Sequence, residues 1–263
     1  MLQSEQNNKQ QLCEGQIRSR LEEAHGNVKI CTFAEIDSTN TEAKRMAASG
    51  FSGCALIAAD RQSAGRGRMG RSFFSPSGTG AYFSILYTPH TSLSDTVTVT
   101  GAAAVAVMRA IRALTGIQTE IKWVNDLYLN GKKVCGILAE SVCGERGTQV
   151  IVGIGINLCT EDFPAELCGI AGSLGADAVS PSQLIAETFL QLYPFLQNPH
   201  DRSWLEDYRT HSCVLGKAIR WYRNGVEYEG IAREIDDDGA LIAKRTDGSI
   251  ERLFTGEITI RIQ

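Results

Sequence analysis

Apolar positions recur at helical spacing near the start of the chain. Residues 8–25 place Leu12, Ile17 and Leu21 roughly on one side of a helix. The pattern predicts a single amphipathic helix, which we take as an N-terminal helical extension over residues 1–26.

Strand and helix signals alternate over the next sixty residues. Thr39, with Glu42 three residues later, predicts a capping box that opens a helix over residues 39–49, and Gly50 ends it. We expect strands at 28–33 and 54–59, an Arg- and Gly-rich loop over 61–70, and a strand at 81–87, which is an aromatic and β-branched run.

A long apolar segment and a turn dipeptide organise the middle of the chain. The small, apolar run from 93 to 114 is too long for a strand and predicts a buried helix. Asn130-Gly131 can adopt the positive φ angles of a type I′ turn, which predicts a hairpin of residues 120–129 and 132–142. We further expect a strand at 149–158, an irregular segment at 160–179 and a helix from Ser180-Pro181 to 197.

The pattern changes near Ser212. From there, β-branched runs alternate with the turns Asn224-Gly225, Asp238-Gly239 and Asp247-Gly248 at short, regular spacing. About fifty residues with three tight turns predict a five-stranded SH3-like barrel docked on a larger domain. We expect an α/β (α+β) chain with a main domain at 27–212 and an SH3-like domain at 213–263.

Composition and charge exclude several classes of protein. The 263 residues are 43% hydrophobic and 21% charged, which excludes collagen-like, disordered and disulfide-scaffold chains. A net charge of −4 provides no whole-chain positive field, so nucleic-acid binding would need a local basic patch. The longest charge-free stretch, Ser72 to Ser94, is broken by Pro and Gly and cannot span a membrane. Because the N-terminus has no secretory signal, we expect a soluble, cytoplasmic protein.

The cysteines and histidines do not indicate a metal site or a catalytic group. The eight cysteines include no C-x-x-C pair and most lie in apolar runs, so we expect buried, reduced thiols. None of the four histidines pairs with another ligand at metal-binding spacing, so neither a zinc site nor acid–base catalysis by His is expected.

The most unusual segment is the loop from Gly65 to Arg71, GRGRMGR, which follows Arg61-Gln62. Its glycines allow the backbone to approach a ligand closely, and its arginines can grip phosphate or carboxylate oxygens. The Gly-Lys-Ser/Thr ending of a P-loop is missing. On the residues alone, a solvated basic loop and a nucleic-acid contact remain alternatives.

Two further clusters lie in or at the ends of strands. In KWVND, residues 122–126, an extended strand would point Lys122 away from its apolar neighbours and into a site, or Lys122 would pair with Asp126. In GIGIN, residues 153–157, two glycines in an apolar strand indicate close approach by a ligand or by another strand.

Taken in order, these segments resemble the bacterial biotin protein ligases, also called biotin–acetyl-CoA-carboxylase ligases. The resemblance runs from about Phe33 to the C-terminus. Its markers are Ser38-Thr39-Asn40, the GRGRMGR loop followed by Ser75-Pro76, KWVND, GILAE from Gly136, GIGIN, and GEI from Gly256. That family combines an α/β catalytic domain on a mixed sheet, shared with lipoate ligases, with an SH3-like C-terminal domain.

The resemblance implies a two-step reaction. ATP and biotin give biotinyl-5′-AMP and pyrophosphate, and a lysine of a biotin carboxyl carrier protein then takes the biotin. ATP and Mg²⁺ are the implied cofactors, with biotin as substrate. Since both reactants of the first step are anions, fixed positive charge is needed, and the implied catalytic residues are Lys122, Arg66 and Arg68. A glycine-hinged loop that closes over the intermediate would exclude water.

Residue roles follow from the same resemblance. Ser38, Thr39, Asn40 and Gln62 would line the biotin pocket, Arg66, Gly67 and Arg68 would close over the ligand, and Lys122 would contact the biotin carboxylate and the α-phosphate. Asn125 and Asp126 would serve the nucleotide, with Asp126 a candidate Mg²⁺ ligand, and Asn157 would lie near the adenylate. With Gly136, these complete the implied binding residues, all of which precede residue 160.

Several departures and alternatives accompany the resemblance. Phe73 stands where the family usually has Trp, and Val124 replaces the commoner Pro, so we expect altered packing and little change in chemistry. About thirty residues precede the first catalytic strand, too few for a winged helix-turn-helix, so a biotin-responsive repressor that binds specific DNA is disfavoured. A lipoate-type ligase or acyltransferase is the other alternative. The carrier protein and homodimer formation are left open.

Overall fold

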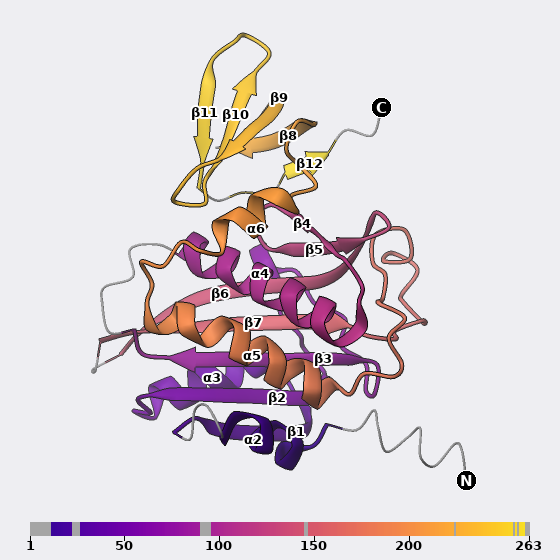
Figure 1. Ribbon diagram of the computed structural model, residues 1–263, viewed down its shortest axis with the longest axis vertical. Helices are drawn as coiled ribbons and strands as arrows, with labels where there is room; N and C mark the ends of the chain where they lie inside the picture. The colour runs from indigo at the N-terminus through magenta and orange to yellow at the C-terminus, as the bar shows by residue number, and fades with distance from the viewer. Residues whose placement is uncertain are drawn as a thin grey trace.

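A seven-stranded mixed sheet forms the centre of the larger part of the molecule (Figure 1). The computed structural model describes residues 12–22, 27–89, 96–144, 147–223, 225–254, 256 and 258–260. The strands are β1 (Lys29–Ile36), β2 (Cys54–Gln62), β3 (Gly80–Tyr87), β4 (Glu120–Lys122), β5 (Asp126–Leu129), β6 (Lys132–Gly144) and β7 (Gly147–Asn157). Their order is β1-β2-β3-β7-β6-β5-β4; β1 and β2 are parallel and the other neighbours antiparallel, which confirms the expected mixed sheet.

Helices cover both faces of this sheet. The long helices α4 (Thr96–Thr115) and α5 (Pro181–Gln197) lie on one face, and α3 (Thr39–Ala48) lies on the other, behind the sheet in Figure 1. The helix α2 (Glu14–Glu22) packs beside α5 and β1. Because both faces are covered, every residue of the central strand β3 is buried.

By length and composition alone, the helix α4 could span a membrane. Its window Thr98–Thr115 is long and apolar enough to cross a bilayer. Most of this window is buried inside the protein, where small residues such as Ala103 and Ala106 let the helix approach the sheet and α5. Burial of that kind is typical of the core helix of a globular protein.

Most predicted elements appear within a few residues of their expected bounds, with two corrections. The capping box at Thr39 is wrong: Ser38 is the N-cap residue, and Thr39 turns its hydroxyl to Gln62 instead. The predicted strand 120–129 is also interrupted, because residues 123–125 turn between β4 and β5. The Asn130-Gly131 turn is confirmed, with φ of 52° and 76°.

At the N-terminus, the described part of the predicted helix is α2. Ile17 and Leu21 are buried and Leu12 is partly buried against the core, as the periodicity predicts. Residues 8–11 and 23–25 of the prediction lie outside the described residues.

The cysteines depart from expectation. All eight are unpaired, but only Cys135 and Cys213 are buried. Cys13, Cys143 and Cys168 are exposed because they lie just before a helix, near the tip of the β6–β7 hairpin, and in the irregular segment after β7. The expectation of buried thiols is therefore wrong at these three positions.

The C-terminal residues form a second, five-stranded antiparallel sheet (Figure 1). Its order is β11-β10-β9-β8-β12. The strands are β8 (Ala218–Arg223), β9 (Val226–Ile235), β10 (Leu241–Arg245), β11 (Ile250–Leu253) and β12 (Ile258–Ile260). Gly225, Gly239 and Gly248 have positive φ at the three predicted turns. Asn224 lies outside the described residues.

Hydrogen bonds link β4 and the turn after it to the second sheet and to the segment that leads into it. The indole Nε1 of Trp123 donates to the carbonyl oxygen of Gly239 over 3.0 Å, and the hydroxyl of Tyr208, on the short helix α6 (Leu205–Thr210), donates to the carbonyl of Val124, also over 3.0 Å. The backbone of Ile121 bonds to both residues that flank Ser212. The two sheets therefore share one continuous hydrophobic core.

We predict that Trp123→Phe lowers the free energy of unfolding by about 1–3 kcal/mol, because the buried carbonyl of Gly239 loses its donor. Urea denaturation measures the change. Tyr222→Phe is the control, since that hydroxyl is on an exposed side chain of the second sheet and its loss should cost no more than about 0.5 kcal/mol. Equal stability of the two variants would contradict the prediction.

Candidate active site

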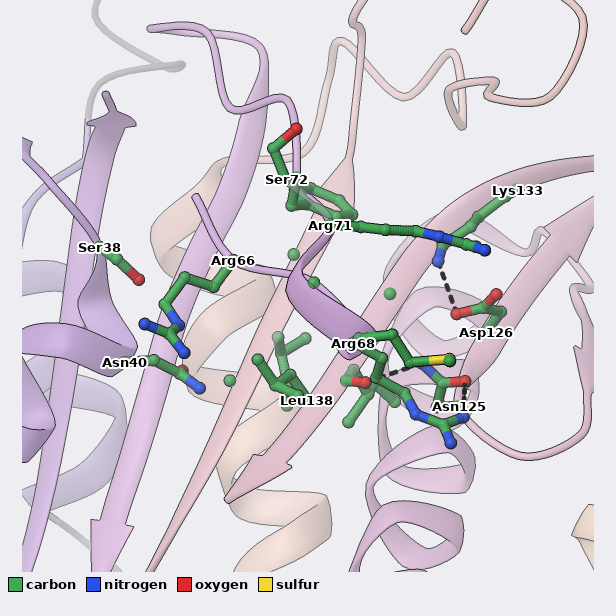
Figure 2. A pocket seen from close by; sticks show the side chains of 18 of the residues that line it. Ser38, Asn40, Arg66, Arg68, Arg71, Ser72, Asn125, Asp126, Lys133 and Leu138 are labelled. Carbon is green, nitrogen blue, oxygen red and sulfur yellow. Dashed lines mark hydrogen bonds and ion pairs between the residues drawn. The ribbon is translucent and has the colours of Figure 1, made fainter. Parts of the chain in front are cut away.

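A cavity of about 130 Å³ opens between the N-terminus of α3, the GRGRMGR loop, the turn after β4, and the middle of β6 and β7 (Figure 2). Eleven of the twelve residues predicted for the site line it. They are Ser38, Thr39, Asn40, Gln62, Arg66, Gly67, Arg68, Lys122, Asn125, Asp126 and Gly136. Segments far apart in sequence, from Ser38 to Ile258, thus meet at one site.

A chain of hydrogen bonds forms one wall of the cavity. Gln62 accepts from the amide and the hydroxyl of Thr39, over 2.9 and 3.2 Å, and donates to Ser75 over 2.9 Å. The hydroxyl of Ser84 lies 2.7 Å from that of Thr39 and 2.6 Å from Oδ1 of Asn40. Because Thr39 and Asn40 are buried, this network fixes which donors and acceptors face the cavity.

The glycines of GIGIN make room for side chains of this chain. A Cβ on Gly153 would lie 2.0 Å from Oδ1 of Asn40, and a Cβ on Gly155 would lie 2.5 Å from the ring of Phe73. The same ring lies 3.1 Å from the Cβ position of Gly136. The close approach inferred from sequence is therefore made by Asn40 and Phe73, and Phe73 forms part of the cavity floor.

The GRGRMGR loop is folded back on itself. The amide of Gly67 donates to the carbonyl of Arg71 over 2.7 Å, and that of Phe73 donates to the carbonyl of Gly65 over 2.9 Å. Met69 at the tip has φ of 55° and is exposed. Backbone hydrogen bonds thus hold the base of the loop, while its tip remains exposed.

Two arginines of this loop reach opposite parts of the cavity (Figure 2). Arg68 donates to Oδ1 of Asn125 over 2.9 Å, and the amide nitrogen of Asn125 donates to the carbonyl of Ile137. Arg66 points instead toward Asn40 and lies 3.5 Å from Glu140.

Positive charge is concentrated at the cavity although the whole chain carries net charge −4. Five cationic side chains and one carboxylate line it: Arg66, Arg68, Arg71, Lys122, Lys133 and Asp126. Such a site favours anionic ligands, since the interaction between charges strengthens where water is partly excluded.

Lys122 lies over an aromatic ring and does not pair with Asp126. Its Nζ is 5.2 Å from the centroid of Tyr128 and 3.3 Å from the hydroxyl of that residue. Asp126 pairs with Lys133 instead, over 2.6 Å. The alternative of a Lys122–Asp126 ion pair is therefore wrong, and Lys122 reaches the cavity as the strand geometry predicted.

One predicted residue lies elsewhere. Asn157, at the end of β7, is buried, does not line the cavity, and donates to the carbonyl of Gly172 over 3.0 Å. The side chain supports the irregular segment after β7. The geometry therefore gives no support to its predicted place near the adenylate.

Sequence reasoning missed several lining residues. Arg71 and Lys133 add two of the five cations, and Gly256 and Ile258 bring the second sheet to the cavity. The binding residues named from sequence all precede residue 160, and Gly256 and Ile258 add a contribution from the C-terminal sheet. The signals were present: Arg71 closes the GRGRMGR loop, Lys133 stands three residues before Gly136, and Gly256 begins GEI.

The described lining of the cavity offers one carboxylate as a candidate ligand for Mg²⁺. Among the described residues, no group of three or more His, Cys, Asp and Glu side chains could hold a metal ion. Asp126 is the carboxylate on the lining, and the ammonium of Lys133 already contacts it. The expectation that Asp126 binds Mg²⁺ thus finds no support in this geometry.

The sequence matches families and relatives of known activity. Residues 32–157 match the biotin/lipoate A/B protein ligase family, and residues 214–261 match the biotin protein ligase C-terminal domain. The chain is 35% identical over 246 residues to the bifunctional ligase/repressor BirA of Bacillus spizizenii, covering 86% of this chain and 72% of that protein. It is 36% identical over 235 residues to a biotin–acetyl-CoA-carboxylase ligase of Paracoccus denitrificans, covering 82% and 94%.

The fold agrees with these relatives. A structure of biotin protein ligase from Aquifex aeolicus in complex with biotin and ATP matches with a TM-score of 0.76 at 26% identity, covering 89% of this chain and 99% of that one. The chain is therefore a member of the biotin protein ligase family.

We predict that Gly155→Ala lowers the free energy of unfolding by about 1–3 kcal/mol, because the added methyl overlaps the ring of Phe73. Gly169→Ala is the matched control, since nothing lies within 4 Å of its Cβ position. Urea denaturation measures both. In a Phe73→Ala background the cost of Gly155→Ala should fall; an equal cost in both backgrounds would contradict the proposed clash.

Proposed function

We propose that this chain activates biotin with ATP to biotinyl-5′-AMP and then transfers the biotin to a specific lysine of a biotin carboxyl carrier protein. The observation that carries the proposal is the convergence of five cations on a cavity with a neutral, hydrogen-bonded wall. A carboxylate and a triphosphate repel each other, so the first step needs fixed positive charge and alignment more than a protein nucleophile.

The two parts of the cavity suit the two ends of biotin. The wall formed by Ser38, Thr39, Asn40 and Gln62 presents oriented donors and acceptors, which fit the uncharged ureido end. The cations fit the carboxylate and the phosphates. In this arrangement Lys122 contacts the carboxylate and the α-phosphate, as the resemblance implies.

The remaining lining residues have narrower roles. Arg66, Gly67 and Arg68 close over the ligand, and Lys133 adds charge beside the phosphates. Asn125 serves the nucleotide, with its amide held by Arg68 and by the carbonyl of Ile137. Because Gly136 has no side chain, the ring of Phe73 can pack close to it.

Magnesium enters this proposal as part of the substrate. Mg²⁺ commonly binds through phosphate oxygens with only one or two protein carboxylates. We therefore assign the ion to MgATP, with the phosphates as its principal ligands. Asp126 orients Lys133.

The proposed activity goes with a division of the chain into domains, a cellular location and a partner. We divide the chain into an extension at 1–26, a catalytic domain at 27–212 and an SH3-like domain at 213–263. We place the protein in the cytoplasm, with the carrier as its macromolecular partner and without sequence-specific DNA binding. Homodimer formation is compatible with this proposal and is not required by it.

A pyrophosphate exchange assay tests the activity. With biotin, the protein should catalyse exchange between labelled pyrophosphate and ATP, because adenylate formation is reversible. With lipoate at the same concentration, exchange should stay near background. Exchange stimulated by lipoate alone would replace the proposal by a lipoate-type ligase on the same fold.

We predict that Lys122→Ala raises the barrier to adenylate formation by roughly 2–4 kcal/mol, the cost typical of losing one donor that stabilises developing charge. Biotin binding should fall less. Single-turnover formation of biotinyl-5′-AMP measures the effect. Lys132→Ala, which removes an exposed ammonium outside the cavity, should leave the rate close to that of the wild type; equal rates for all three proteins would refute the role.

A further inference from the structure

Tyr208 supports the turn at residues 123–125 from outside the cavity. It lies on α6, and its side chain is buried. Its hydroxyl donates to the carbonyl of Val124 over 3.0 Å, although 84 residues separate the two in sequence. Tyr208 and Val124 do not line the cavity, but the next two residues of the turn, Asn125 and Asp126, both do. Tyr208 therefore contacts the chain directly beside the lining.

The hydroxyl of Tyr208 is a donor at every pH near neutrality, because burial raises the pKa of this phenol above its usual value. The acceptor belongs to a buried residue, Val124. A buried carbonyl that loses its donor costs free energy. The hydrogen bond therefore favours one orientation of the peptide group that follows Val124.

Both chain neighbours of Tyr208 anchor α6. Asp207 pairs with Arg109 of α4 over 2.7 Å. Arg209 donates to the carbonyl of Ile235, at the end of β9, also over 2.7 Å. Figure 1 shows α6 at the junction of the two sheets. The helix is thus fixed to α4 and to the second sheet at once, and the position of the Tyr208 hydroxyl is fixed with it.

On its other side, Asn125 is held by β6. Its main-chain carbonyl accepts from the amide of Ile137 over 2.9 Å, and its Nδ2 donates to the carbonyl of the same residue, also over 2.9 Å. The carbonyl of Val124 and the amide of Asn125 belong to one planar peptide group. Asn125 therefore lies between two peptide groups, one held by Tyr208 and the other by Ile137.

We propose that Tyr208 is a positioning residue for the nucleotide: it fixes the peptide group before Asn125 and thereby sets the direction of the Asn125 side chain in the cavity. The kinetic consequence rests on the proposed function, in which Asn125 serves the nucleotide. The effect of the hydroxyl on the turn is a property of the fold and does not depend on that function.

The variant Tyr208→Phe keeps the buried ring and removes the donor. In the pyrophosphate assay at saturating biotin, it should raise KM for ATP by about three- to ten-fold with little change in kcat. The dissociation constant for biotin alone should stay that of the wild type, because the wall formed by Ser38, Thr39, Asn40 and Gln62 lies on other elements and does not contact Tyr208.

Hydrogen–deuterium exchange tests the turn without any assay of function. The reporter is the amide of Ile137, which donates to the carbonyl of Asn125. In the protein without ligands, Tyr208→Phe should raise the deuteration rate of this amide, followed by NMR, by about five- to ten-fold, since the turn opens more easily when one of its hydrogen bonds is lost.

Gln149→Met is the matched control for a loss of stability. Gln149 is buried, and its Nε2 donates to the carbonyl of Phe51 and to the hydroxyl of Thr88, each over 3.0 Å, at the opposite end of β7 from the cavity. Its replacement should lower the free energy of unfolding, measured with urea, but change neither the deuteration rate of Ile137 nor KM for ATP.

A double variant shows whether Tyr208 acts through Asn125. In an Asn125→Ala background, Tyr208→Phe should cause no further rise in KM for ATP, because the side chain that it positions is absent. If Tyr208→Phe does not fold, Arg209→Met loosens α6 from the second sheet and should raise KM for ATP and the deuteration rate of Ile137 in the same direction.

Three results would overturn the proposal: an unchanged KM for ATP in Tyr208→Phe, an equal rise in Gln149→Met, or additive effects of Tyr208→Phe and Asn125→Ala. Faster deuteration of Ile137 with an unchanged KM would show that the hydrogen bond holds the turn but does not position the nucleotide, and the proposal would fail. A wild-type protein without biotin-dependent pyrophosphate exchange would instead refute the proposed function and leave the deuteration result to stand.

Discussion

The close approach of two side chains to the glycines of β7 is the constraint on which the rest of the site depends. Asn40 and Phe73 occupy the space that a Cβ would take on Gly153 and Gly155. Asn40 brings the N-terminus of α3 against the sheet, and Phe73 brings the end of the GRGRMGR loop to the cavity floor. If either glycine carried a side chain, it would overlap Asn40 or Phe73, and the N-terminus of α3 and the end of the GRGRMGR loop could not both lie against β7 as they do.

Local charge, and not the charge of the chain, decides what this site can bind. The chain carries net charge −4, yet arginines and lysines from three separate segments meet around one carboxylate. Fixed positive charge in a partly enclosed space lowers the cost of bringing two anions together, which is the main physical difficulty in joining a carboxylate to a nucleotide phosphate.

The second sheet packs against the first and contributes residues to the cavity. The hydrogen bond from Trp123 to Gly239 joins the turn after β4 to the second sheet, and Trp123 lies only two residues before the lining residue Asn125. Gly256 and Ile258 themselves line the cavity. A sheet of this size buries little core by itself, so docking stabilises it. The same docking supports the turn that carries KWVND, and it therefore couples the stability of the second sheet to the geometry of the site.

Local patterns in the sequence determined most of the elements. Helical and strand periodicity, and the turns at Asn130-Gly131 and at the three glycines of the second sheet, depend on residues a few positions apart, so they can be deduced without a tertiary structure. The ordered motifs also identified eleven of the lining residues by resemblance to a family. Capping at Thr39 failed because the helix already begins at Thr39, so that Ser38 takes the N-cap position, and the Thr39 hydroxyl donates to Gln62.

Only the tertiary structure decided which charges and side chains meet. Lys122 contacts Tyr128, Asp126 contacts Lys133, and Asn157 turns away from the cavity. Glu140 joins Arg66 across 74 residues of sequence. These partnerships depend on strand register, on the direction of each side chain and on packing between remote segments. The periodicity of the sequence cannot predict these contacts, because the residues next to each partner in sequence would be the same whichever distant residue it contacted.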